Sequence, residues 1–266
     1  MNQELIDFCE LYNLPLEHLG ATLKDPKVIP MIRGKAFEFS VKDRLSQVLN
    51  QNIWHISKPF VNPQLGSHDQ DVLIKHLPTN TEITIECKLS AKGQYKFQTN
   101  ESIFKIKCMR SRTLGPELVR RLAPLRGMSE KSLSVHNDQY LLGDFDLVIT
   151  SLANAFYSTN EDGIFVWDPS ALGQSFLEQK YGVGLSEKQY QDAAFNDMYV
   201  ARASDLIISE TNEVLCTRKK CSNNQNCGFI PNYPLLKFNH DNLTNPSNRW
   251  VHISNIENLL LNFIEG

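Results

Sequence analysis

Two neighbouring apolar segments, DVLIKHL (residues 71–77) and EITIECKL (residues 82–89), carry Asp71, Glu86 and Lys88. The segments are rich in β-branched residues and flank the turn-forming residues 78–81, which predicts a β-hairpin. Side chains alternate between the two faces of a strand, so Glu86 and Lys88 point to the same side. The chemistry of the hairpin then depends on which residue of the first strand faces them.

Asp71 is the residue that the expected strand pairing brings to this face. If Leu77 lies opposite Glu82 across the turn, then Asp71 lies opposite Lys88, and Glu86 takes the diagonal position. Diagonal neighbours are about 7–8 Å apart at Cα, a separation that a metal ion bound to two carboxylates can span. A slip of one residue would turn Asp71 to the other face, so the pairing is a specific prediction.

Two carboxylates directed at one point repel each other unless a cation joins them or one of them is protonated. Asp71 and Glu86 offer hard oxygen ligands, which suit a Mg²⁺ ion that keeps several of its waters. Lys88 would orient an attacking water or help to remove its proton. The alternative is an ordinary polar hairpin face whose charges pair at the surface.

The residues that follow the glutamate are strongly basic. Residues 88–131 contain eleven Lys and Arg against three acids, a local charge of +8 in a chain whose net charge is −3. This asymmetry is typical of a surface that binds a polyanion, and a solvated, salt-bridged surface is the alternative. With a second basic run near residue 219, the block supplies the residues that we expect to contact DNA: Lys92, Lys96, Lys105, Lys107, Arg110, Arg112, Arg218, Lys219 and Lys220.

The C-terminal third contains a group of cysteines. Cys216, Cys221 and Cys227 fall within twelve residues, and His240 follows thirteen residues later. Thiolates and imidazole are the ligands of structural Zn²⁺, but the spacing differs from the common Cys-x2-Cys knuckle. Two interpretations stay open: a zinc site made of these four residues, or unligated cysteines in a polar loop that contacts DNA without a metal.

The elements around these residues predict an α/β fold with a mixed sheet flanked by helices. Residues 34–49 form a clear amphipathic helix, and a loop through Pro26 and Pro30 precedes it. The segment 101–109 is compatible with either strand or helix. The other expected helices are 3–13, 115–125, 185–200 and 252–265, and the other expected strands are 53–61, 144–152, 163–168, 203–210 and 213–216.

Composition places the chain among globular proteins. Its hydrophobic content is 41% and its charged content 21%, and no apolar run approaches the ~20 residues that span a bilayer. Six cysteines are too few for a disulfide scaffold, and the N-terminus has no basic segment of the signal-peptide kind. We therefore expect a cytoplasmic protein.

Asp71, fourteen further residues and then Glu86-Cys87-Lys88 together resemble the PD-(D/E)xK nuclease superfamily, which includes most type II restriction endonucleases. The apolar residues after the aspartate and before the glutamate resemble the two core strands of that family. The resemblance implies a restriction-endonuclease-like core over residues 30–170, in which Glu38 on the first core helix offers an acid to the metal shell. Gln70 stands where the family motif has proline. Asp69 competes with Asp71 as main ligand, or serves a second metal.

The resemblance implies a Mg²⁺-dependent type II restriction endonuclease that hydrolyses phosphodiester bonds in specific double-stranded DNA sequences. It also implies a homodimer and a cognate DNA methyltransferase in the same system. Residues 1–170 would hold the nuclease core with its N-terminal helices, and residues 171–266 a DNA-recognition or structural region, unless the chain is one domain. The alternatives are a repair or recombination nuclease of the same fold, and a catalytically inactive DNA- or zinc-binding module.

Overall fold

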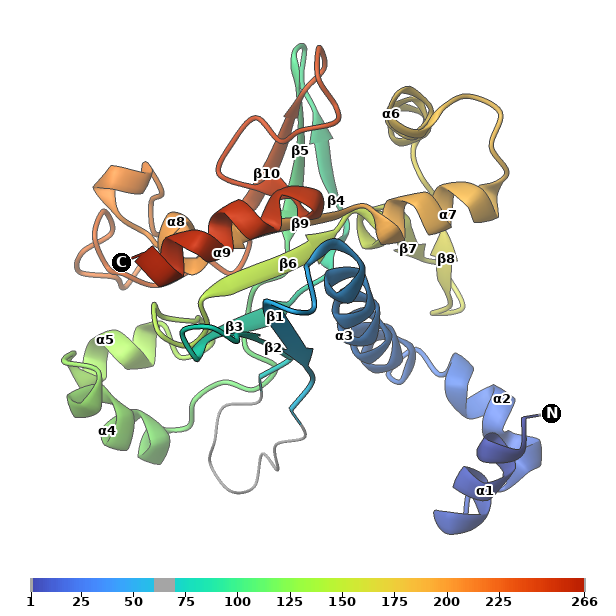
Figure 1. The fold of residues 1–266 in the computed structure, drawn as a ribbon, viewed down its shortest axis with the longest axis horizontal. Helices are drawn as coiled ribbons and strands as arrows, with labels where there is room; N and C mark the ends of the chain where they lie inside the picture. Colours follow the sequence, from blue (N-terminus) through green and yellow to red (C-terminus); the bar gives the residue numbers. More distant parts are fainter. Residues whose placement is uncertain (1, 60–69, 266) are drawn as a thin grey trace.

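The computed structural model describes residues 2–59 and 70–265, which fold around a mixed six-stranded sheet (Figure 1). Its strand order is β1-β2-β3-β6-β9-β11; β3 and β6 run parallel, and the other neighbours run antiparallel. The prediction of a mixed sheet flanked by helices is therefore confirmed. The strands are β1 (Trp54–Ser57), β2 (Val72–His76), β3 (Thr81–Cys87), β6 (Leu147–Ser151), β9 (Met198–Arg202) and β11 (Val251–His252).

The hairpin of β2 and β3 keeps the predicted faces but not the predicted register. His76 pairs with Thr81, and continuing this register places Asp71 opposite Glu86 instead of opposite Lys88. The predicted register is therefore wrong by two residues. Because side chains alternate with a period of two, the shift leaves every side chain on the face that was expected.

The reason for the shift lies in the turn. Pairing resumes at Thr81, so the chain reverses over residues 77–80 instead of 78–81. Asn80 closes the turn with a φ of 60°, a left-handed conformation that asparagine adopts more readily than most residues. The shorter first strand brings Asp71 closer to Glu86 than the sequence predicted.

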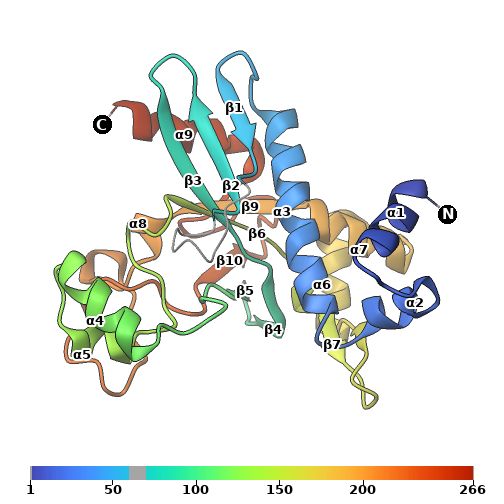
Figure 2. The same cartoon turned by 90° about the horizontal axis from the view of Figure 1, so that it is seen from below.

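Two helices cover one face of the sheet. Phe37, Val41 and Leu45 of α3 (Ile29–Val48) pack with α9 (Ile256–Glu265) on the apolar side chains of β1, β2, β3, β6 and β9. Figure 2 shows α3 running alongside β1 and β2. The long helix thus fixes the position of its own acidic residues relative to the hairpin.

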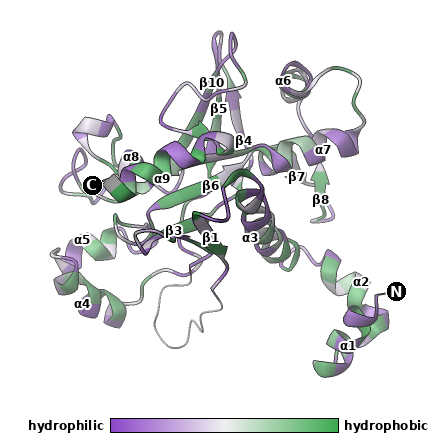
Figure 3. Cartoon of the chain, in the orientation of Figure 1, coloured by the Kyte–Doolittle hydropathy of each residue, from purple (hydrophilic) through white to green (hydrophobic). Residues whose placement is uncertain are grey.

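The opposite face packs against a second, three-stranded sheet of order β10-β5-β4 and two helices. Four phenylalanines, Phe104, Phe156, Phe176 and Phe238, make stacked, tilted or edge contacts within this core. Strand β6 lies between the two cores and is buried along its whole length, including the polar Thr150 and Ser151 at its end, so it has the hydrophobic colour of Figure 3 only in part. These elements are β4 (Ser90–Phe97), β5 (Glu101–Ile106), β10 (Leu235–Asn239), α6 (Ala171–Tyr181) and α7 (Glu187–Asn196).

A third, smaller core lies beneath α4 (Pro116–Leu125) and α5 (Glu130–Val135). There, Leu133 packs with Cys216 and Phe229 of a C-terminal segment that contains no helix or strand from residue 213 to residue 228. The remaining elements lie at the edges of the molecule: α1 (Gln3–Leu11), α2 (Leu16–Lys24), β7 (Tyr157–Thr159), β8 (Phe165–Trp167) and α8 (Ala203–Leu206).

Several predicted elements are wrong in the C-terminal half. The predicted strand 203–210 begins as helix α8, and the strand itself, β9, lies at the end of the predicted helix 185–200. Burial on both faces removes the alternation that marks a strand in a sequence. The predicted strand 213–216 is irregular, since Glu213 takes a left-handed φ of 55°.

In the N-terminal half, the helices and strands differ less from those predicted. Helix α2 occupies part of the predicted loop, and α3 begins at Ile29, with Pro30 in its first turn, where a missing N–H costs nothing. The ambiguous segment 101–109 contains strand β5. Strands β9 and β11 join the main sheet, so the sheet contains strands from both sides of residue 170, the predicted boundary between the two regions. In the described part of the chain, no helix is long and apolar enough to span a membrane.

Asp197 joins α6 and α7 to the sheet. Its carboxylate accepts hydrogen bonds from the hydroxyls of Tyr181 (2.7 Å) and Tyr199 (2.6 Å), and it pairs with Lys180 (3.2 Å). Burial disfavours the ionised acid, but these bonds and the bond to His252 outweigh burial and hold the pKa of Asp197 below its ordinary value.

We predict that Asp197→Asn lowers the free energy of unfolding by about 3 kcal/mol near neutral pH, because it leaves a buried lysine unpaired. The contribution of a carboxylate with a lowered pKa is complete above about pH 4 and is lost as pH falls through the folded-state pKa. The wild-type advantage should therefore shrink in acid, as urea denaturation will measure. Asp192→Asn, in an exposed pair with Lys188, is the control and should change stability little; equal effects of the two variants would contradict the assignment.

Candidate functional site

Asp71, Glu86 and Lys88 converge where β2 begins and β3 ends. The Oδ2 of Asp71 accepts a hydrogen bond from the backbone N–H of Cys87 (2.8 Å), and the Lys88 Nζ lies 2.5 Å from the Glu86 Oε1. The two acidic residues are 8% and 5% exposed, so they are not the surface charges of an ordinary hairpin. The structure thus brings together the three residues that the sequence predicted.

Glu86 is held in place by a residue that sequence reasoning missed. The Tyr140 hydroxyl donates a hydrogen bond to the same Oε1 that contacts Lys88, at 2.7 Å. The ring of Tyr140 also lies under two cations, with the Lys88 Nζ 5.5 Å and the Arg110 Cζ 4.8 Å from its centroid. The Oε1 of Glu86 is therefore held by two donors.

Glu38 reaches the same region from α3. It is 6% exposed and forms ion pairs with Lys35 (2.9 Å) and Lys58. The Lys58 Nζ also lies 3.4 Å from the backbone oxygen of Asp71, so this lysine bridges the helix and the hairpin. The acid implied by the family resemblance thus lies beside the hairpin carboxylates.

The three carboxylates act on one another electrostatically. Burial and then the charges of Glu86 and Glu38 raise the pKa of Asp71 to about 8. Burial disfavours the ammonium form of Lys88, but the Glu86 carboxylate outweighs it and raises the pKa of Lys88. Because its pKa is raised, Lys88 is a charged hydrogen-bond donor near neutral pH and cannot accept a proton.

Asp71, Glu86 and Glu38 offer only oxygen atoms as ligands. Carboxylate oxygens are the ligands that Mg²⁺ prefers, and a buried Asp71 repelled by two acids is a group whose ionised form a cation would stabilise. In this structure the acids are instead bonded to Cys87, Tyr140 and lysines, without gathering as one three-carboxylate cluster. Asp69 lies outside the described residues.

A different group of metal-ligand side chains gathers at the third core. The ligand atoms of His136, Cys216, Cys221 and Cys227 all lie within 4.8 Å of one another, so this cluster could hold a metal ion. Burial raises the pKa of the Cys227 thiol to about 12 and lowers the pKa of His136.

His240 does not belong to this cluster, and its prediction as the fourth ligand is corrected. It follows β10, and its Nε2 lies 3.0 Å from the Ser102 hydroxyl of β5. His136, at the end of α5, takes its place. Sequence spacing missed His136 because eighty residues separate it from Cys216, and only the fold brings them together.

The predicted DNA-binding residues are dispersed. Arg110 forms an ion pair with the buried Asp144, which also pairs with Arg126 (2.6 Å). Arg218 pairs with Asp138, and Lys92 contacts the hydroxyl of Thr159. Lys105 donates to Gln94 at 3.2 Å. The exposed members are Lys92, Lys96, Lys107, Arg112, Lys219 and Lys220.

Comparisons with known protein families, with curated proteins and with solved structures found no match for this chain.

We predict that Asp71→Asn changes the pH dependence of metal-free stability. A folded-state pKa of about 8 against about 3.9 in the unfolded chain means that stability falls as pH rises between these values, by at most about 1.4 kcal/mol per pH unit. Asparagine keeps the acceptor for Cys87 and removes the charge, so the variant should lose less stability across this range. Thermal unfolding in a chelator will measure it. Glu82→Gln, exposed on the same strand, should follow the wild type; a parallel decline in all three proteins would exclude a raised pKa.

Proposed function

We propose that this chain is a Mg²⁺-dependent endodeoxyribonuclease, and specifically a type II restriction endonuclease that cuts specific double-stranded DNA sequences. The observation that carries the proposal is the convergence of buried Asp71 and Glu86 with Lys88 at the end of the β2–β3 hairpin, with Glu38 beside them. A purely structural role does not account for three buried acids that repel one another.

Asp71 and Glu86, with Glu38 near them, would hold the metal, which when bound neutralises charge on the phosphodiester and makes water more acidic. Tyr140 and the Cys87 N–H orient the two main carboxylates. Lys88, as a charged donor, would orient the attacking water and stabilise negative charge on the phosphate. Water forms a bond to phosphorus as a P–O bond of the backbone breaks; the attacking water releases one proton to solvent, and the departing oxygen takes one proton from solvent.

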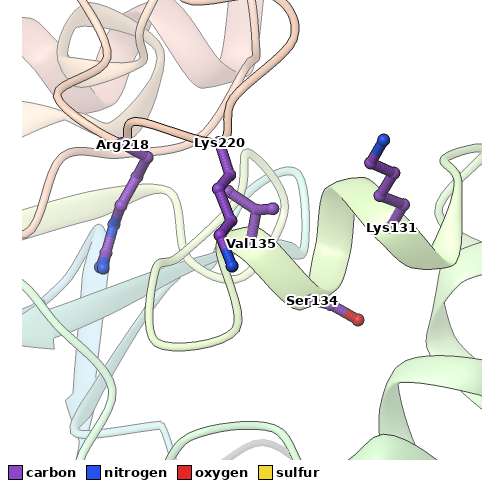
Figure 4. Close-up of a pocket in the computed structure, with 5 residues that line it drawn as sticks. All are labelled: Lys131, Ser134, Val135, Arg218 and Lys220. Carbon is purple, nitrogen blue, oxygen red and sulfur yellow. The ribbon is translucent and has the colours of Figure 1, made fainter.

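A basic surface beside α5 suits the DNA backbone. Lys131, Ser134, Val135, Arg218 and Lys220 line an open pocket (Figure 4). Across residues 2–59 and 70–265, Lys131 and Lys220 form no ion pair, so their charges remain available to phosphates. A symmetric recognition site would be met by a homodimer, and a cognate DNA methyltransferase would protect the same sequence in the host.

We predict that Asp71→Ala, Glu86→Ala and Lys88→Ala each reduce cleavage of plasmid DNA in Mg²⁺ by about a thousand-fold or more, since each removes a ligand or the charged donor. Binding to DNA should survive in each variant, as fluorescence anisotropy will measure. Glu82→Ala, on the same strand but exposed, is the matched control and should cleave normally.

The products of DNA cleavage distinguish a restriction endonuclease from the alternative functions. Discrete bands from wild-type digestion support a restriction endonuclease. A smear, or nicking of branched DNA alone, would assign the chain to repair or recombination. Binding without cleavage by the wild type in Mg²⁺ would show an inactive DNA-binding module, and full activity of Asp71→Ala would refute the site.

We predict that replacing Lys131 and Lys220 by alanine weakens DNA binding and makes it less sensitive to salt. Each lost phosphate contact lowers the slope of log affinity against log salt by about 0.9, so the double variant should lose about 1.8. Lys24→Ala, an exposed residue of α2, should leave the slope unchanged, since α2 lies at the right of Figure 1 and α5 at the left. An unaltered slope in the double variant would remove this surface from the DNA interface.

A further inference from the structure

The irregular C-terminal segment has isolated backbone hydrogen bonds, such as that from the Cys216 N–H to the Asn224 oxygen (2.7 Å), but lacks the regular ladder of a helix or strand. Residues 213–228 contain no helix or strand, yet Cys216 is only 9% exposed and packs in the third core. A segment of this length without secondary structure generally needs another constraint. The cluster of His136 with Cys216, Cys221 and Cys227 is placed to provide it.

The His136 ring is oriented with one nitrogen ready to act as a ligand. The Nε2 of Gln139 donates to the backbone oxygen of Ile230 (2.9 Å), so the Oε1 of Gln139 faces the His136 Nδ1 at 2.5 Å and accepts a hydrogen bond from its N–H. The lone pair then lies on Nε2 of His136. Within the described residues this buried atom has no hydrogen-bond partner.

A buried nitrogen without a hydrogen-bond partner lowers the stability of the folded state unless another group binds it. The imidazole also stacks on Phe229, with ring centroids 4.2 Å apart, so it has little freedom to turn towards another partner. Histidines that bind a metal ion through Nε2 commonly donate the Nδ1–H to an acceptor such as the Gln139 oxygen, which fixes the ring.

Two of the cysteine sulfurs accept hydrogen bonds from the backbone. The Cys216 Sγ accepts a hydrogen bond from the backbone N–H of Arg218 at 3.4 Å, and the Cys227 Sγ accepts one from the N–H of Phe229. In each case the donor is two residues after the cysteine. Backbone donors directed at sulfur stabilise a thiolate more than a thiol.

We propose that His136, Cys216, Cys221 and Cys227 bind one structural Zn²⁺ ion. Three sulfurs and one imidazole nitrogen are the soft and borderline ligands that zinc prefers, and four protein ligands complete its tetrahedron, leaving no position for substrate. Binding converts three thiols to thiolates and releases their protons to solvent. The ion would take no direct part in the proposed hydrolysis of DNA.

The ion would connect two functional parts of the molecule. Arg218 and Lys220, which line the pocket of Figure 4, lie in the loop that the cysteines hold. His136 is four residues before Tyr140, which orients Glu86, and the Ile230 N–H donates to the Tyr140 backbone oxygen at 2.8 Å. Zinc would therefore fix the basic loop relative to α5 and support the tyrosine beside the carboxylates.

The test is the metal content of the purified full-length chain, measured by mass spectrometry after dialysis. The wild type should carry about one zinc per chain, and His136→Gln and Cys221→Ser should lose most of it. His240→Gln is the matched control and should keep its zinc, because His240 contacts Ser102 instead. Asp71→Ala should also keep zinc, which separates failure of this proposal from failure of the proposed nuclease.

Substitution with Co²⁺ provides a readout that does not depend on the folding of variants. A tetrahedral site with three thiolates gives intense ligand-field and sulfur-to-cobalt charge-transfer absorption, which should appear in the wild type and vanish when excess Zn²⁺ is added. A wild type without zinc and without this spectrum overturns the proposal. So does a disulfide between two of the three cysteines, or zinc loss in His240→Gln with retention in His136→Gln.

Discussion

Mutual repulsion among buried carboxylates is the constraint on which the centre of this structure depends. Asp71, Glu86 and Glu38 each have less than a tenth of their surface exposed, and burial with this repulsion raises the pKa of Asp71 to about 8. Charges in such a place are stable only if each has a partner. Lys88 and Lys58 provide the opposite charges, and the Cys87 N–H and the Tyr140 hydroxyl provide donors.

These partners come from separate parts of the chain, and the packing of the sheet brings them together. Helix α3 and the hairpin meet through the apolar core that contains Phe37 and Ile85, which places Glu38 beside the hairpin acids. Tyr140 arrives through the segment that precedes β6, and β6 pairs in parallel with β3 so that Val148 lies opposite Glu86. A polar site of this kind therefore requires the hydrophobic layers on both sides of the sheet.

The segment 136–144 connects the two candidate metal sites. His136 faces the cysteines, Tyr140 holds Glu86, and Asp144 pairs with both Arg110 and Arg126. Part of the basic block thus neutralises an interior acid, while Lys131 and Lys220 remain at the surface. A charge count along the sequence cannot separate these two uses of arginine and lysine, because the separation depends on burial.

The sequence by itself determined the hairpin, the shared face of Glu86 and Lys88, and the helix that carries Glu38, since these follow from local periodicity. The face of Asp71 was predictable for the same reason, although Asn80 moved the turn and changed the residue opposite it. Strand β9 escaped prediction because burial on both faces leaves no alternation. Only the tertiary structure decided that Tyr140 and Lys58 serve the carboxylates, and that His136, not His240, joins the cysteines. Contacts between residues far apart in the chain have no local pattern, because they are set by how the apolar layers pack.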